Sequence, residues 1–403
     1  MRILHTADWH IGKKLHKKEL YQDFDLFIDW LCKFLPENDI DILLVSGDVF
    51  DFSNPSSESR TQYYRTLIKL KKFDLKIIIT GGNHDSPSVL EAPKAILNEL
   101  DIHVIGQRPE NLQDCLIPIY KDENVELVIA ALPYLRNRDL QERFDAENHD
   151  SKQKAVQQSI AYHFQETASL AKKKHPDVPL IGMGHLFAKG VSLSDSEREI
   201  QIGNLAGLDA SHFGSNYSYI ALGHIHKPQR LNSETPIFYS GSPTPLSFSE
   251  RKNEKRILVI DTSKSFEPES ISIQKFRDLI LVKGSLEKIK KKLSEITNTH
   301  PLQTLIEIEM EEEHFSPSKT IELEEYIEAF EAEACEIVKH KVSFKYKPEG
   351  LRGITSTEEQ ISDFTPLEVF HKKLESVDET ETSKEELISA FEEILDELNR
   401  PEQ

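Results

Sequence analysis

The stretch Asp41-Ile-Leu-Leu-Val-Ser-Gly-Asp-Val-Phe-Asp51 predicts both the fold and the chemistry of this chain. Its apolar part, residues 42–45, is β-branched at both ends and is typical of a short strand buried on both faces. Gly47 lets the backbone turn where the strand ends, and Asp48 follows it directly. Because open α/β sheets bind ligands beyond the carboxyl ends of their strands, we expect Asp48 at the centre of a functional site.

Similar apolar runs recur along the chain, and helical spacings of apolar residues separate the early ones. This alternation indicates an α/β layered fold. The later runs follow one another more closely, which predicts a second sheet and hence a sandwich of two β-sheets flanked by helices. The expected strands are residues 2–7, 41–46, 76–80, 102–105, 126–132, 179–183, 217–222, 236–239 and 256–261.

Length and cysteine content narrow the class of protein. The 403 residues are enough for two or three domains, and no apolar run approaches the roughly 20 residues of a membrane-spanning helix. Cys32, Cys115 and Cys335 are widely spaced and form no Cys-x-x-Cys pair, which favours a reducing, cytoplasmic setting. The first ten residues already contain Asp8 and His10, so we do not expect them to be a cleaved signal peptide.

The net charge of −20 is unevenly distributed. Residues 351–403 hold 15 acidic and 5 basic side chains and therefore carry half of the excess. The rest of the chain is only mildly acidic. This balance argues mildly against tight DNA binding by the isolated chain.

Polar residues follow five of the expected strands, and in four cases a glycine stands immediately before the first of them. Each motif alone is a weak signal. Strand ends in one sheet system lie side by side, however, so we expect these residues to converge. They are Asp8, His10, Asp48, Asn83, His185, His224 and His226. His5 lies inside the first expected strand and is interpreted as a hydrogen-bonded core histidine.

Seven imidazole and oxygen ligands exceed the needs of one metal ion. Two divalent ions that share a bridging carboxylate account for the number. The set contains no thiolate, which suits catalytic Mn²⁺, Fe²⁺ or Zn²⁺ better than structural zinc. Two metal ions arranged in this way bind a phosphate between them and lower the pKa of a bound water, so the sequence predicts phosphoester hydrolysis.

His84 directly follows Asn83 and is expected to face the substrate instead of the ions. An imidazolium there would stabilise charge on the reacting phosphate or protonate the leaving oxygen. For Asp85 two roles stay open: it orients His84, or it caps the following turn.

The motifs that carry these residues resemble those of calcineurin-like metallophosphoesterases. Within that superfamily the chain is most similar to the SbcD family, the bacterial branch of the meiotic-recombination nucleases. The similarity covers nearly the whole chain. It rests on the stretches Thr6–Gly12, Gly47–Asp51, Leu132–Asp139, Gly223–Lys227 and Tyr239–Ser247.

The resemblance implies one Mn²⁺ held by Asp8, His10, Asp48 and His226, and a second held by Asp48, Asn83, His185 and His224, with His84 as the catalytic histidine. It also implies a homodimer within a heterotetramer that includes SbcC, a long coiled-coil ATPase. The implied reactions are 3′–5′ exonuclease cleavage of double-stranded DNA and endonuclease cleavage at hairpins or blocked ends, in DNA repair, recombination and replication.

Basic side chains near the motifs are candidate DNA contacts, because cations at the rim of such a site neutralise backbone phosphates. Solvated surface positions are the equally weighted alternative. The charged stretch 136–154 is interpreted as a mobile surface loop. The candidates are Lys13, Lys14, Lys17, Lys18, Arg136 and Arg138.

The pattern changes after the predicted nuclease domain, residues 1–265. Residues 275–350 are expected to form a small α+β unit in the order β-α-β-α-β, with its second helix running from Leu323 to Ile337. The resemblance implies that this unit is a capping domain that helps to select DNA.

The last part of the chain predicts a linker, residues 351–362, and a helical hairpin, residues 363–403. Two capping-box patterns begin at Thr365 and Ser383. Each is followed by a narrow apolar stripe of the coiled-coil type. We favour docking of this hairpin on the SbcC coiled coil over packing on its own domain. The stripes consist of Leu367, Phe370, Leu374 and Val377, and of Leu387, Phe391, Ile394 and Leu398.

Two other functions remain open from the sequence. A phosphatase or small phosphodiesterase of the same superfamily would share the ligand set, but would not need the accessory unit or the hairpin. A DNA-end scaffold without catalytic activity is disfavoured, because a decayed site usually loses some of its ligands.

Overall fold

The computed structural model describes residues 1–141, 149–193, 197, 207–314 and 316–346, and six single residues between 370 and 391. It divides into two compact units. The first contains Met1–Leu281, Glu295–Glu307 and Glu331–Lys339. The second contains Val282–Ser294, Ile308–Phe330 and the described residues from His340 onward.

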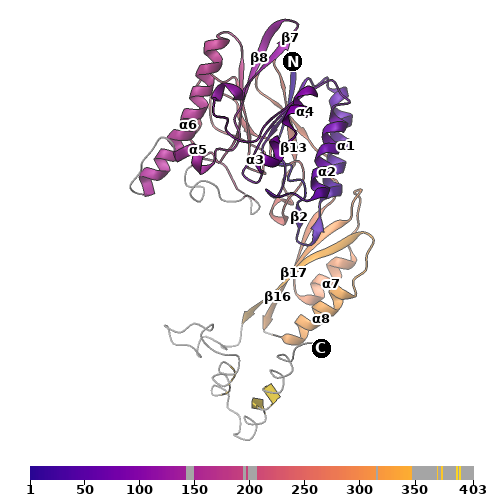
Figure 1. The fold of residues 1–403 in the computed structure, drawn as a ribbon. Helices are drawn as coiled ribbons and strands as arrows, with labels where there is room; N and C mark the ends of the chain where they lie inside the picture. Colours follow the sequence, from indigo (N-terminus) through magenta and orange to yellow (C-terminus); the bar gives the residue numbers. More distant parts are fainter. Residues whose placement is uncertain are drawn as a thin grey trace, which may run out of the picture. The chain divides into compact units, whose positions relative to one another are not determined.

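Two six-stranded mixed sheets form the first unit (Figure 1). In the first sheet, ordered β14-β13-β1-β4-β5-β6, the last four strands are parallel and the first two pair antiparallel. Its strands are β1 (Arg2–Thr6), β4 (Ile42–Ser46), β5 (Lys76–Thr80), β6 (Ile102–Ile105), β13 (Arg256–Asp261) and β14 (Glu269–Ser272).

The second sheet has the order β11-β12-β10-β9-β8-β7, with four parallel strands between two antiparallel edges. Its strands are β7 (Leu116–Lys121), β8 (Asn124–Ala131), β9 (Leu180–His185), β10 (Tyr219–Gly223), β11 (Gln229–Arg230) and β12 (Ile237–Tyr239). Strand β7, which contains Pro118, was not predicted from the sequence. Since β7 lies at the sheet edge, the missing amide of proline is tolerated there.

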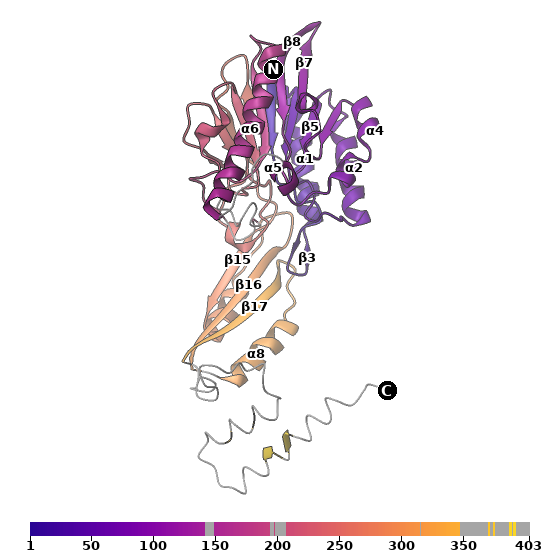
Figure 2. The ribbon, with the colours of Figure 1, turned by 60° about the vertical axis from the view of Figure 1, so that its left-hand side comes forward.

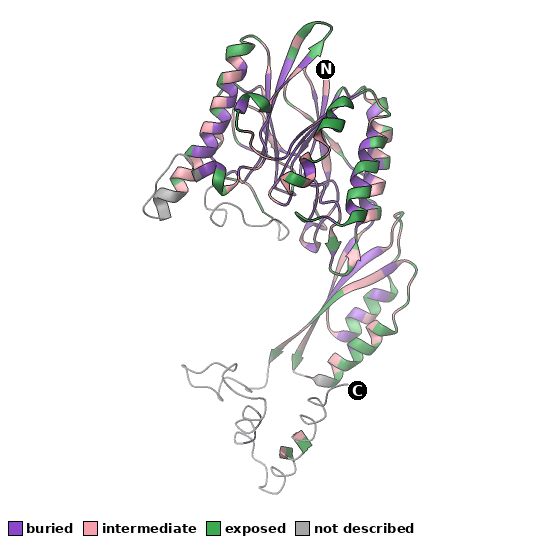
Figure 3. Ribbon diagram, viewed as in Figure 1, coloured by how far each residue is buried: buried purple, intermediate pink, exposed green. Residues whose placement is uncertain are grey.

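Strand β4 shows why the sheets pack as a sandwich. Ile42 and Leu44 belong to the core between the two sheets, whereas Leu43 and Val45 belong to a second core under the helices. All four are at most 1% exposed, as expected for a strand buried on both faces. In Figure 3 the central strands of this unit are accordingly coloured mostly as buried.

Helices cover the outer faces of both sheets. Helices α1 (Tyr21–Glu37) and α2 (Ser57–Leu70) lie along the first sheet, and α6 (His149–Lys174) lies along the second, as Figures 1 and 2 show. Shorter elements are α3 (Pro87–Glu91), α4 (Lys94–Glu99), α5 (Asn137–Gln141), the hairpin β2 (Lys14–Leu15) and β3 (Lys18–Glu19), and the 3₁₀ turns η1 (Leu112–Cys115), η2 (Ala210–Phe213) and η3 (Phe248–Glu250).

The interpretation of residues 136–154 as a loop was wrong where the structure describes them. Helix α5 occupies Asn137–Gln141, and α6 begins at His149. The side chain of Asp139 accepts a hydrogen bond from the Arg136 amide at 2.8 Å, a local turn contact that starts α5. Among the described residues, none of the helices combines the length and apolar character needed to cross a bilayer.

The accessory region has the expected element order. Strand β15 (Leu279–Gly284) is followed by α7 (Leu286–Ser294), β16 (Thr304–His314), α8 (Pro317–Glu328) and β17 (Cys335–Tyr346), and the strands form one sheet in the order β15-β16-β17. The predicted extension of the second helix to Ile337 was wrong. Ile337 lies in β17, which pairs with β16, and this pairing overrides local helical spacing.

Much of the predicted linker and hairpin lies outside the described residues, including Leu367, Val377, Ile394 and Leu398. One described residue of each stripe contacts the other stripe. The rings of Phe370 and Phe391 stack with centroids 4.1 Å apart, and Leu374 is buried, whereas Leu387 is 44% exposed.

His5 is the core histidine that the sequence predicts, and it makes the stability of this unit dependent on pH. It is fully buried, and Nδ1 lies 2.9 Å from the Tyr219 hydroxyl. Burial lowers its pKa from 6.5 to about 3. The unfolded chain therefore takes up a proton at a pH where the folded chain does not, so stability is fully present above pH 6.5 and is lost as pH falls toward 3.

We expect protonation of His5 in the unfolded chain to lower the free energy of unfolding by about 3 kcal/mol as the pH falls from 6.5 to 4. His5→Asn, which keeps a polar group beside Tyr219, should flatten this part of the pH profile. Urea unfolding of both proteins across this range measures the difference. Parallel profiles for the two proteins would contradict the assignment.

Candidate metal centre

The predicted ligands lie together at the carboxyl ends of the parallel strands, and four of them have unusual backbone angles. Asp8, His10 and Asp48 have φ values of 53°, 44° and 48°, and His224 has 101°. Non-glycine residues in this region are strained, and such strain persists only where surrounding contacts enforce it. Here the Asp8 amide donates to Gly47 O and the His10 amide donates to Asp48 O, both at 3.0 Å. The turn after β1 is thus bonded to the turn after β4.

The glycines that precede the ligands are needed mainly because the ligand side chains pack directly against them. A Cβ on Gly82 would lie 2.1 Å from Asp48 Oδ1, and one on Gly47 would lie 2.2 Å from His185 Nδ1. Neither position tolerates a side chain, because the ligands themselves occupy the space. The Gly-Asp and Gly-Asn motifs therefore reflect how tightly the loops converge.

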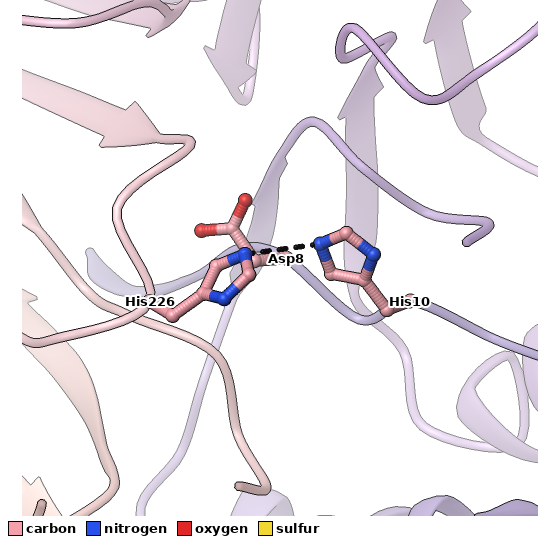
Figure 4. Close-up of side chains that lie close together, drawn as sticks. All are labelled: Asp8, His10 and His226. Carbon is pink, nitrogen blue, oxygen red and sulfur yellow. Dashed lines mark hydrogen bonds between the residues drawn. The ribbon is translucent and has the colours of Figure 1, made fainter. Parts of the chain in front are cut away.

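Asp8, His10 and His226 form the first group of possible ligands, shown in Figure 4. One ligand atom from each lies within 4.8 Å of the other two, and each residue is at most 2% exposed. His10 Nε2 and His226 Nε2 face each other at 3.2 Å. Two imidazole nitrogens pointed at one another inside a protein are well placed to share a cation.

Asp48, His185 and His224 form the second group. Asn83 closes it, because its Oδ1 lies 2.9 Å from His185 Nε2 and 3.2 Å from His224 Nδ1. Its oxygen and nitrogen donors suit a hard or borderline divalent ion.

Asp48 joins the two groups. Its Oδ1 accepts a hydrogen bond from the His84 amide at 2.9 Å. Its Oδ2 lies 3.3 Å from His185 Nε2, 3.6 Å from His10 Nε2 and 4.0 Å from His84 Nε2. One carboxylate oxygen therefore faces imidazoles of both groups, as a shared ligand must.

In three of the histidines the ring is oriented by a hydrogen-bond acceptor near Nδ1, the nitrogen that faces away from the cluster. His185 Nδ1 lies 3.0 Å from Ser46 O, His10 Nδ1 lies 3.0 Å from Asp51 Oδ1, and His226 Nδ1 lies 3.2 Å from Glu250 Oε1. Each acceptor places the proton on Nδ1 and leaves the Nε2 lone pair directed into the cluster. Metal-binding histidines are held in this way in proteins.

Polar atoms without partners show that the residues fit bound cations. Asp8 Oδ2 and His224 Nε2 are buried and have no hydrogen-bond partner among the residues that the structure describes. Burial raises the pKa of Asp8 to about 7. Burial disfavours charge on His185 too, but the charge and hydrogen bond of Asp48, the charge of Asp8 and the Ser46 carbonyl together outweigh it and raise the pKa of His185 to about 9. A divalent cation would give Asp8 Oδ2 a partner and displace the protons that such a cluster otherwise retains, whereas His224 would bind through Nδ1, which faces Asn83 Oδ1.

His84 lies at the edge of this cluster. Its Nδ1 contacts Asp51 O at 2.7 Å, and its ring packs edge-on against His10 with centroids 4.7 Å apart. With Asp48 and His10 it also forms a third group of possible ligands. The side chain is 4% exposed, and its Nε2 lies 4.0 Å from Asp48 Oδ2.

Asp85 has neither of the two roles left open by the sequence. Its carboxylate accepts hydrogen bonds from the amides of Val49 and Phe50 at 3.1 and 2.9 Å, and from the Gly82 amide at 2.8 Å. It thereby ties the loop after β4 to the loop after β5. Orientation of His84 comes from the Asp51 carbonyl instead.

The six basic candidates are placed in two ways. Lys13 and Arg136 border the cluster: Lys13 Nζ lies 3.2 Å from Asp51 Oδ1, and Arg136 donates to Asp85 O at 2.6 Å. The others lie farther out. Lys14 forms an ion pair with Glu19, and Lys18 forms one with Glu336. Arg138 donates a hydrogen bond to the side chain of Gln107. Lys17 is exposed.

The residues behind the ligands were not predicted from the sequence. Asp51 was part of a quoted motif, but its contact to His10 was not expected. Glu250 and Lys255 follow no strand-end pattern, and nothing in their spacing marks them. The quoted stretch Tyr239–Ser247, just before them, was the available signal.

Comparison with known proteins agrees with this geometry. Residues 1–228 match the family described as calcineurin-like phosphoesterase, and residues 275–378 match a family described as type 5 capsule protein repressor C-terminal domain.

Three proteins that carry the name of the SbcD component of the nuclease SbcCD are similar to this chain. The one from Escherichia coli (strain K12) is 32% identical over 322 residues, which cover 77% of this chain and 79% of the relative. The one from Rhodobacter capsulatus is 36% identical over 283 residues, covering 68% and 69%. The one from Bacillus subtilis is 30% identical over 271 residues, covering 65% and 66%. This chain therefore belongs to the SbcD family of calcineurin-like phosphoesterases.

Proposed function

We propose that this chain is the nuclease component of an SbcCD-type complex and hydrolyses phosphodiesters of double-stranded DNA. The observation that carries the proposal is the single Asp48 oxygen that faces both ligand groups, in a chain of this family. The proposed activities are 3′–5′ exonuclease cleavage and endonuclease cleavage at hairpins or blocked ends.

Asp8, His10, Asp48 and His226 would hold one divalent ion, and Asp48, Asn83, His185 and His224 a second. Mn²⁺ is the proposed ion, since all the donors are nitrogen or oxygen. When bound, such ions position the phosphate and lower the pKa of an attacking water.

His84 is proposed to act on the leaving oxygen. Asp51 O holds its Nδ1, so the ring presents Nε2 toward the cluster, where it can donate a proton or stabilise negative charge. Lys13 and Arg136, which border the cluster, are proposed to contact the flanking DNA phosphates, with Lys14, Lys17, Lys18 and Arg138 farther along the strand.

Purified protein with Mn²⁺ should degrade linear duplex DNA from its ends and cut DNA hairpins. A small chromogenic phosphodiester, assayed in parallel, reports on the metal site without DNA contacts. Hydrolysis of the small ester alone would favour a phosphodiesterase, and activity on neither substrate would favour a scaffold.

We further propose that residues 275–350 form a DNA-selecting cap and that the hairpin at 363–403, beyond the linker at 351–362, binds the coiled coil of an SbcC-type ATPase. The proposed assembly contains a homodimer of this chain. Support comes from the stacked rings of Phe370 and Phe391 and from the exposure of Leu387, which leaves apolar surface for a partner helix.

Deleting residues 363–403 should abolish co-purification with the ATPase partner, because the apolar stripes are removed, while nuclease activity of the isolated chain survives. Leu387→Asp in the full-length chain is the milder variant and should weaken binding about tenfold or more. If the truncated chain still co-purifies with its partner, the hairpin is not the docking element.

A further inference from the structure

The surroundings of His226 are not explained by the strand-end motifs. Its Nδ1 faces Oε1 of Glu250, at the end of η3, and Glu250 is fully buried. A carboxylate in this position selects the tautomer with the proton on Nδ1. The Nε2 atom, which faces His10, is then available to a metal ion.

Lys255 holds Glu250 in place. The two side chains form a buried ion pair, and Lys255 is only 6% exposed. Lys255 Nζ also donates to the carbonyl of His226 at 3.1 Å and to Ser242 Oγ at 2.7 Å. One ammonium group thus contacts both the backbone of His226 and the carboxylate that orients the ring of His226.

The stretch Tyr239–Ser247, singled out in the sequence but without a role so far, completes this arrangement. The Ser242 amide donates to His226 O at 3.2 Å. Gly241 has a φ of 78°, and a Cβ there would lie 2.7 Å from the same carbonyl oxygen. Glycine is therefore required for the loop to pack against the backbone of His226.

We propose that Glu250 and Lys255 are positioning residues that fix the ring of His226 for one of the two metal ions, an inference that rests on the proposed two-metal site. Stability alone does not account for the pair, since a buried ion pair seldom adds net stability over apolar residues of similar size. The chain offers a comparison in Asp23 and Arg277, a buried bidentate pair at 2.6 and 2.8 Å that contacts none of the proposed ligands in the described structure.

The test is Mn²⁺ binding by the purified full-length chain, monitored by calorimetry and by electron paramagnetic resonance. Wild type should bind two ions. Glu250→Gln should weaken one of them about 10–100-fold and leave the other nearly unchanged, because hydrogen-bond partners of metal-bound histidines have effects of this size. The double variant Glu250→Leu with Lys255→Met leaves no unpaired buried charge and should show the same selective loss.

Asp23→Asn is the matched control, because it breaks a buried ion pair away from the cluster and should keep both Mn²⁺ ions. Two unchanged ions in both Glu250 variants would overturn the positioning role while the metal site itself stands. A loss of both ions in the control as well as in the Glu250 variants would also overturn it, since the effect would then be general destabilisation. Wild type that binds no Mn²⁺ would contradict the proposed metal site and this inference together.

Discussion

Asp48→Asn should remove both metal ions and reduce nuclease activity about a thousandfold or more. The carboxamide can still accept the hydrogen bond from the His84 amide through Oδ1, so the backbone of the loop is preserved. The negative charge at Oδ2, which faces His10 and His185, is lost. Loss of a hydrogen-bond partner behind a ligand costs about 10–100-fold, and loss of a ligand shared by two ions must cost more.

Asp8→Asn is the informative comparison for this prediction. Asp8 belongs to one ligand group only, so its variant should lose one ion and keep the other. Mn²⁺ titrations should find no bound ion in Asp48→Asn, one bound ion in Asp8→Asn and two in wild type. Equal stoichiometry in both variants would show that Asp48 is not shared.

His84→Ala should have the second largest effect, a loss of about 10²–10⁴-fold in the cleavage rate. The side chain is proposed to act on the leaving oxygen and is not among the proposed ligands. Both Mn²⁺ ions should therefore remain bound, and affinity for a phosphorothioate duplex that resists cleavage should change little.

His212→Ala serves as the control for His84→Ala, since it removes a histidine that lies outside the ligand groups. Its activity should equal that of wild type. Should His84→Ala lose a Mn²⁺ ion as well as activity, His84 would be a ligand, as its place beside Asp48 and His10 also permits.

The strand-end pattern was sufficient to find the cluster because of a general property of parallel sheets. Polar residues that follow β1, β4, β5, β9 and β10 must emerge at neighbouring sheet edges, whatever their separation in the sequence. The same pattern could not show that one oxygen of Asp48 faces both groups. That detail depends on side-chain rotation, which spacing does not determine.

Three of the errors and omissions have a common origin in contacts between distant segments. Asp85 bonds amides of the loop after β4, some 35 residues earlier, so its local sequence suggested a cap or an orienting role instead. Ile337 fits a helical stripe by spacing but pairs in a sheet. Glu250 contacts His226 across 24 residues without any motif that joins them. In each case the folded chain supplies a partner that local spacing cannot reveal.

The most direct test of the central claim is an anomalous difference map from a crystal soaked in Mn²⁺. Two peaks are expected about 3.5–4 Å apart, with the Asp48 carboxylate between them and the two ligand groups on either side. A single peak, or peaks that do not involve Asp48, would contradict a shared carboxylate and the two-ion chemistry proposed for this chain.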